Sequence, residues 1–157
     1  MIVKQNWNKK MDIVGFLEGK TPDHRGRMLS MLWKQTDDHA ENNHDYIQWM
    51  FPLEEPSQAV NGAPVLNKFD IDEIRENRLA IGNLKESARW FLEFLERNDH
   101  WITSYDHNHL RITRAIKSLR LLSSDQAADE FRDKVIALAG DNLNLVDQEA
   151  RDFWASA

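Results

Sequence analysis

The chain has 157 residues, 41% hydrophobic and 29% charged, a composition typical of one globular domain rather than a disordered chain. It contains no cysteine, which excludes a disulfide framework and any thiolate metal site. Because 20 basic residues face 26 acidic ones, the formal charge is −6, which argues against nucleic acid as the partner.

The N-terminal segment, residues 1–7, lacks the apolar run of a signal peptide. No later segment approaches the roughly 20 apolar residues that cross a bilayer. We therefore expect a soluble, cytoplasmic protein without a membrane partner.

The first predicted helices lie between residues 21 and 51. Thr21-Pro22-Asp23 has the pattern of a helix start, and the apolar spacing continues to Trp33. A second helix is predicted from Asp37 or Asp38 to Met50 or Phe51, with Asp38 and Glu41 as N-cap and N3 residues. Pro52 ends it, because proline disfavours helical geometry in the residue before it.

One long loop follows, because residues 52–64 hold three of the four prolines. Residues 70–98 are then predicted to be helical in two pieces that meet near Gly82. A helix is expected over residues 106–122. Ser123 and Gln126 form a capping-box pair for the next helix, which Gly140 ends, and residues 144–154 form the last one.

No segment alternates between polar and apolar residues as a strand does. The fold class predicted is therefore all-α, as a single compact multi-helix domain over residues 1–157. We expect about six or seven helices and one long proline-rich loop.

Two of the predicted helices carry a polar stripe between apolar residues. At about 100° per residue, Asp37, Glu41, His44 and Gln48 share one stripe. His107, Arg111, Arg114 and Ser118 share the other, and leucines border it. Arginines enclosed by leucines require a negative partner, because an uncompensated buried charge costs several kcal/mol.

Two interpretations of these stripes remain open. In the first, they pair with each other, Glu41 accepting from an arginine, as a buried structural clasp. In the second, they line a cleft that grips a carboxylate or phosphate. Either interpretation selects the same candidate residues: Glu41, His44, Gln48, His107, Asn108, Arg111 and Arg114.

Other chemistry has less support. Glu41-x-x-His44 is half of a di-iron pattern whose second copy is missing, and His107-x-His109 cannot present both rings on one helix face. No serine has a Gly-x-Ser-x-Gly setting, and no glycine-rich phosphate loop is present. We predict no metal, no cofactor and no catalytic residue, and favour a non-enzymatic role.

The segments with the two stripes also resemble a known family. His44-Asp45-Tyr46-Ile47-Gln48-Trp49-Met50-Phe51-Pro52-Leu53 resembles the signature of the opioid growth factor receptor conserved region. Residues 107–114 resemble its second block, and residues 22–27 and 63–66 also match family positions. The resemblance covers about residues 16–135.

The resemblance implies a binding or scaffold module for a peptide or protein partner, since the vertebrate receptor is associated with an enkephalin-type peptide. The chain resembles a short, stand-alone member without the receptor's tail of repeats. We expect the contact surface where the two striped helices meet, with the loop over it. The alternative is an enzyme or a binder of small anions that uses a His/Arg cleft.

Overall fold

The structure, a computed structural model, describes residues 11–157, and the helices account for all regular elements in that range. The α-helices are α1 (Ile13–Leu17), α2 (Leu29–Trp33), α3 (Asp37–Asn42), α4 (Ile47–Met50), α5 (Lys68–Arg75), α6 (Arg78–Arg97), α7 (Asn108–Leu122), α8 (Asp125–Ala139) and α9 (Gln148–Ser156). Two 3-10 helices complete the list, η1 (Asp99–Trp101) and η2 (Gly140–Leu145).

The all-α prediction is confirmed, with nine α-helices in the described range where six or seven were expected. Within residues 11–157, none of the helices combines the length and apolar character needed to span a bilayer. Residues 1–7, in which we predicted no signal peptide, lie outside the described part of the chain.

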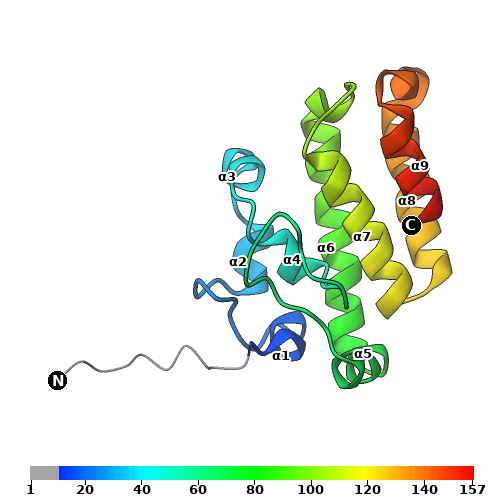
Figure 1. Ribbon diagram of the computed structural model, residues 1–157. Coiled ribbons are helices and arrows are strands. Elements are labelled where there is room, and N and C mark those ends of the chain that lie inside the picture. Colours follow the sequence, from blue (N-terminus) through cyan, green and yellow to red (C-terminus); the bar gives the residue numbers. More distant parts are fainter. Residues whose placement is uncertain (1–10) are drawn as a thin grey trace.

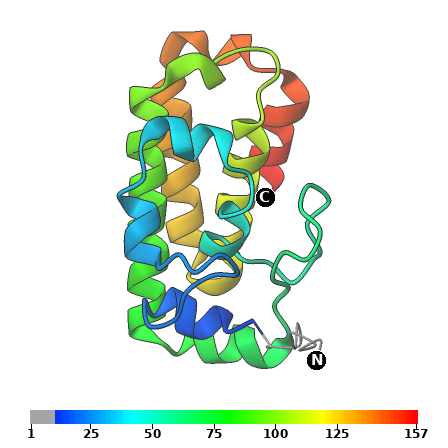
Figure 2. The same ribbon diagram turned by 90° about the vertical axis from the view of Figure 1, so that its left-hand side faces the viewer.

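The long helices form the body of the molecule. Figure 1 shows α6, α7 and α8 side by side, and α9 packs against α7. The short helices α1 to α4 lie on the other side of α6 and α7, and α5 crosses one end. Figure 2 shows the loop of residues 52–64 projecting from the side of this body. The arrangement leaves α7 in contact with α6, α8 and α9.

Helix α6 supplies the centre of the core. Its apolar face of Leu84, Ala88, Phe91 and Leu95 is buried, and Trp90 and Phe94 join it. Phe91 stacks on Phe131 of α8 with ring centroids 6.2 Å apart. Burying each such ring contributes about 2–3 kcal/mol, so this face fixes where α8 packs.

Two predicted boundaries of the longer helices differ from the structure. The break expected at Gly82 falls instead at Asn77, whose side chain accepts from the N–H of Ala80 and starts α6. A glycine inside a helix costs only about 1 kcal/mol, which the packing of α6 outweighs. Ser124, and not Ser123, caps α8 by accepting from the N–H of Ala127.

The predicted helix start at Thr21-Pro22-Asp23 is a turn. The buried Asp23 carboxylate accepts from the backbone N–H groups of Arg25 and Arg27, both at 2.9 Å. Gly26 adopts a φ of 76°, a left-handed conformation that glycine favours. These bonds close the turn, and α2 begins only at Leu29.

The single helix predicted over residues 37–50 was also wrong. It is divided into α3 and α4, with the extended residue Asn43 between them. Thr36, and not Asp38, caps α3 by accepting from the N–H of His39 at 3.2 Å. The stripe drawn on a continuous helix therefore does not exist as one line, and His44 lies exposed in the connection.

Candidate functional site

The break between α3 and α4 faces Arg111, a buried residue of α7. The Arg111 guanidinium donates to the carbonyl oxygens of Ala40 at 2.9 Å, Asn43 at 2.8 Å and Glu41 at 3.3 Å. The last carbonyls of a helix lack N–H partners and carry partial negative charge. Arg111 therefore supplies the donors that the end of α3 lacks.

The next two polar residues along this side of α7 make the same kind of contact. Arg114 donates through Nε to the carbonyl of Phe51 at 2.8 Å and through Nη2 to that of Gln48 at 3.5 Å. The Ser118 hydroxyl donates to the carbonyl of Pro52 at 2.9 Å. We call Arg111, Arg114 and Ser118 the donor row of α7.

The clasp interpretation paired Glu41 with an arginine, and no such pair occurs among the described residues, where the ionic partners of Glu41 are His100 and His107. Within the described residues, the two guanidiniums donate to backbone carbonyls and to the Asn108 side chain. The helix ends thus provide the negative partner, as dipoles instead of a carboxylate. Burial lowers the pKa of Arg114 to about 10, against the attraction of Glu55, so Arg114 stays charged at neutral pH.

The Glu41 carboxylate pairs instead with two imidazoles, and Asp106 lies nearby. We call these four residues the Glu41 cluster: Glu41, His100, Asp106 and His107. Glu41 Oε1 lies 2.8 Å from His100 Nε2 and 3.0 Å from His107 Nε2. Ligand atoms of Glu41, His100 and Asp106 all lie within 4.8 Å of one another. The cluster joins the end of α3 to η1 and to the start of α7.

Two groups of the cluster have shifted pKa values. Burial raises the pKa of Glu41, but hydrogen bonds from His100 and Asn108 and the nearby imidazole charges outweigh it, and the net shift is downward. Burial and the charge of Arg111 lower the pKa of His107, against Glu41 and Asp106. His107 is therefore neutral at pH 7.

The remaining predicted residues lie around this junction. The His44 ring meets the His107 ring edge to face at 5.3 Å, and its Nδ1 is 3.5 Å from Arg111 Nη2. Gln48 is buried, and its Oε1 has no hydrogen-bond partner within the described part of the chain. Asn108 donates to Glu41 at 3.2 Å and accepts from Arg111 at 3.2 Å. All seven candidate residues thus lie together.

A second group of charges involves the turn of residues 22–27. Asp45 accepts from Arg25 and Arg27, each at 3.1 Å, and lies 3.4 Å from His24. Arg27 also binds the buried Asp23 at 2.7 Å. The turn of residues 22–27 and the segment of Asp45 both resemble the family, but the sequence alone does not pair them, because no spacing rule relates residues about 20 positions apart.

The loop lies further along α7 than expected. Its first residues pack on the C-terminal half of α7, where Ser118 holds Pro52 and Lys117 lies 3.4 Å from Glu55. Leu53 and Val65 form an isolated bridge that closes the loop. The loop therefore does not cover the Glu41 cluster.

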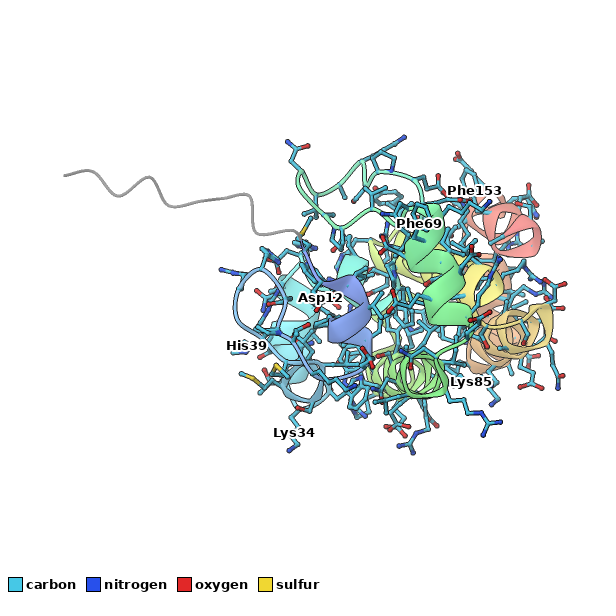
Figure 3. The ribbon with its side chains drawn as sticks, turned by 90° about the horizontal axis from the view of Figure 1, so that it is seen from below. Asp12, Lys34, His39, Phe69, Lys85 and Phe153 are labelled. Carbon is cyan, nitrogen blue, oxygen red and sulfur yellow. The ribbon has the colours of Figure 1, made fainter. Side chains whose placement is uncertain are left out.

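The opposite side of α7 borders a groove of about 150 Å³, the α7–α9 groove. Three large apolar side chains line it and remain exposed, namely Tyr105 (78%), Leu110 (61%) and Phe153 (49%). Figure 3 shows Phe153 on α9 at the periphery of the molecule. Carboxylates border the groove, those of Asp106, Asp147 and Glu149.

Sequence reasoning missed the groove and the place of His100. The groove depends on how α9 docks, which Trp154 determines by donating to the carbonyl of His109 at 3.2 Å. His109 itself points away from His107, and its Nε2 contacts the carbonyl of Trp101 at 2.7 Å. The prediction that His107 and His109 occupy different faces is thereby confirmed.

Comparison with known proteins connects this geometry to a family. A family model described as the opioid growth factor receptor (OGFr) conserved region matches residues 22–99. That range contains the turn, α3, α4, the loop and α6. No solved structure matches the chain.

Curated relatives carry the same name. Opioid growth factor receptor-like protein 1 of Mus musculus is 34% identical over 142 residues, covering 78% of this chain and 30% of the relative. The Rattus norvegicus protein of that name is 35% identical over 143 residues, with the same shares. The opioid growth factor receptor of Mus musculus is 32% identical over 105 residues, 55% of this chain and 16% of the receptor.

The chain therefore spans less than a third of the length of these relatives. The range matched by the family model includes Asp23, Glu41 and Asp45, and it ends one residue before His100. Through residues 22–99, the chain belongs to the opioid growth factor receptor conserved-region family.

Proposed function

We propose that the chain is a binding module for a peptide or protein partner and that the α7–α9 groove is its contact surface. One observation carries the proposal: Tyr105, Leu110 and Phe153 are exposed and line the same groove. Exposed apolar side chains that gather at a concave surface are typical of interaction sites. The name of the Mus musculus relative, opioid growth factor receptor, supports a binding role.

The chemistry of the groove selects the partner. Asp106, Asp147 and Glu149 contribute negative charge beside the apolar side chains, and the whole chain has a formal charge of −6. Carboxylates at the edge of an apolar groove favour a cationic peptide with aromatic or aliphatic residues. We propose the cytoplasm as its location, with which the absence of cysteine is compatible.

The alternative of a small-anion binder has less support. Its cations were Arg111 and Arg114, whose guanidiniums already donate to backbone carbonyls. An anion would have to displace those bonds and leave the carbonyls without donors. The groove, in contrast, needs no rearrangement to accept a side chain.

The test uses an enkephalin-type pentapeptide with an amidated C-terminus, so that its net charge is positive. We expect ¹H–¹⁵N resonances of residues around Tyr105, Leu110 and Phe153 to shift on titration. Phe153→Ser should weaken binding about tenfold, the loss expected for one buried aromatic contact. The peptide with a free C-terminal carboxylate should bind more weakly.

Phe69→Ser is the matched control. Phe69 is 81% exposed on α5 and does not line the groove; Figure 3 shows it at the surface. Its replacement should leave both folding and peptide binding unchanged. Equal binding by the Phe153 and Phe69 variants, or resonance shifts elsewhere on the molecule, would overturn the proposed surface.

A further inference from the structure

We propose that the Glu41 cluster is a binding site for one divalent transition-metal ion, with Zn²⁺ as the preferred ion. The ligands are one carboxylate oxygen each of Glu41 and Asp106 and the Nε2 atoms of His100 and His107. These residues come from α3, η1 and the segment that starts α7. The proposal concerns a site apart from the α7–α9 groove, although Asp106 borders both.

Ligand atoms of Glu41, His100 and Asp106 lie close enough together to surround one ion, and His107 Nε2 lies beside Glu41 as a fourth donor. Bonds of about 2.0–2.1 Å to Zn²⁺ place neighbouring ligand atoms ~3.4 Å apart. Glu41 Oε1 lies 2.8 Å and 3.0 Å from the two imidazole nitrogens, and the atoms of Glu41, His100 and Asp106 lie within 4.8 Å of one another. To admit the ion, the two contacts of Glu41 Oε1 would widen by a few tenths of an ångström, and the remaining ligand atoms, including His107 Nε2, would move closer together.

One atom of the cluster lacks a partner. His107 Nε2 is buried and makes no hydrogen bond with the described residues, although Glu41 Oε1 is only 3.0 Å away. A buried polar atom without a hydrogen-bond partner destabilises the folded chain. A metal ion between these two atoms would use the nitrogen lone pair and relieve that destabilisation.

The charges of the ligands suit a divalent ion. The carboxylates of Glu41 and Asp106 balance the charge of such an ion, which offsets the repulsion from the nearby Arg111.

Asn108 orients the two carboxylates. Its side-chain amide donates to the second oxygen of Glu41 at 3.2 Å, and its backbone N–H donates to Asp106 at 2.9 Å. The same side chain accepts from Arg111 at 3.2 Å. Such contacts, which fix the direction of ligands, are a regular part of metal sites.

The types of ligand atom limit which metal ions the site would prefer. Two imidazoles and two carboxylates, with no thiolate in the chain, suit Zn²⁺ and related ions better than Mg²⁺ or Ca²⁺, which bind oxygen ligands. Bound metal would tie α3 to the connection between α6 and α7. Because a ligand of the folded state raises stability, the melting temperature should report binding.

The experiment titrates the chelator-treated, full-length chain with ZnCl₂ in a calorimeter and follows its melting temperature. We expect one ion per chain and a rise in melting temperature of about 5–10 °C at a hundredfold excess over the dissociation constant. Co²⁺ in place of Zn²⁺ should give the visible absorption of a four-coordinate site.

His100→Ala removes an exposed ligand, so the metal-free variant should melt within about 2 °C of the parent chain. Its affinity for Zn²⁺ should fall at least tenfold. The matched control, His39→Ala, removes an exposed imidazole of α3 outside the cluster and should bind Zn²⁺ unchanged. No binding by the parent chain, or equal affinity in both variants, would overturn the proposal.

Discussion

Replacing Arg111 by methionine removes the donors that hold the end of α3 while keeping an unbranched apolar side chain in place of the arginine stem. Arg111 is 6% exposed and makes five hydrogen bonds, three of them to backbone carbonyls and the others to the side chains of Asn108 and His44. Its guanidinium also lies 5.6 Å from the centre of the Tyr46 ring. The carbonyls of Glu41 and Asn43 would lose these donors.

The contacts give the magnitude. A hydrogen bond from a charged donor contributes about 1.5–3 kcal/mol, and the cation–π contact adds roughly 1 kcal/mol. Two offsets apply: Ala40 keeps the Tyr46 hydroxyl at 2.6 Å, and methionine avoids the cost of burying a charge. The net loss should be about 3 kcal/mol, or about 6–12 °C in melting temperature for a chain of this size.

The assay is thermal and urea unfolding of the ligand-free protein followed by circular dichroism. Arg89→Met is the matched control, because Arg89 is a surface residue of α6 that pairs with Glu86 and Glu93; such pairs contribute under 1 kcal/mol. If the melting temperature of Arg111→Met equals those of the parent chain and of the control, the donor row does not hold α3 in place and the reasoning fails.

Two further predictions concern pH and glycine. Folding lowers the pKa of His107 below its ordinary value of 6.5. As the pH falls, the imidazole is therefore protonated first in the unfolded chain. The contribution of His107 to stability is complete above pH 6.5 and is lost as the pH drops through the pKa of the folded state. Below about pH 4.5 the lowered pKa of Glu41 adds a second loss. Melting temperatures between pH 8 and pH 5 should therefore slope less in His107→Asn, and parallel slopes would contradict this. Gly15→Ala should destabilise by about 1–3 kcal/mol, because its Cβ would meet Asp12 and come within 2.6 Å of Thr21 Oγ1. Gly82→Ala, with open space around it in α6, should stabilise by about 0.5–1 kcal/mol, and equal effects at both sites, seen in urea unfolding, would refute the packing argument.

Local signals predicted that the long helices exist, although not where α6 and α8 begin. The apolar spacing of residues 84–95 and the polar N-terminus and apolar face of residues 108–122 depend only on neighbours within a few turns. Gly140 ends α8 with a φ of 52° because glycine tolerates that conformation. The seven candidate residues also came from sequence, through two stripes and a family resemblance.

Contacts between distant segments decided the rest. Periodicity continues through residues 43–46, yet α3 and α4 separate there, because Arg111, about 70 positions away, provides donors to the carbonyls that the break exposes. A periodic sequence cannot reveal this, since the donors belong to another helix. The same holds for the Glu41 cluster, where His100 joins from 59 positions away.

By itself, the sequence determined that the chain is helical, which faces of α6 and α7 are apolar, and that buried arginines need negative partners. The tertiary structure alone decided what those partners are. Helix ends offer carbonyls whose partial charges satisfy a guanidinium as a carboxylate would, and only the packing of α7 against α3 and α4 brings them within reach.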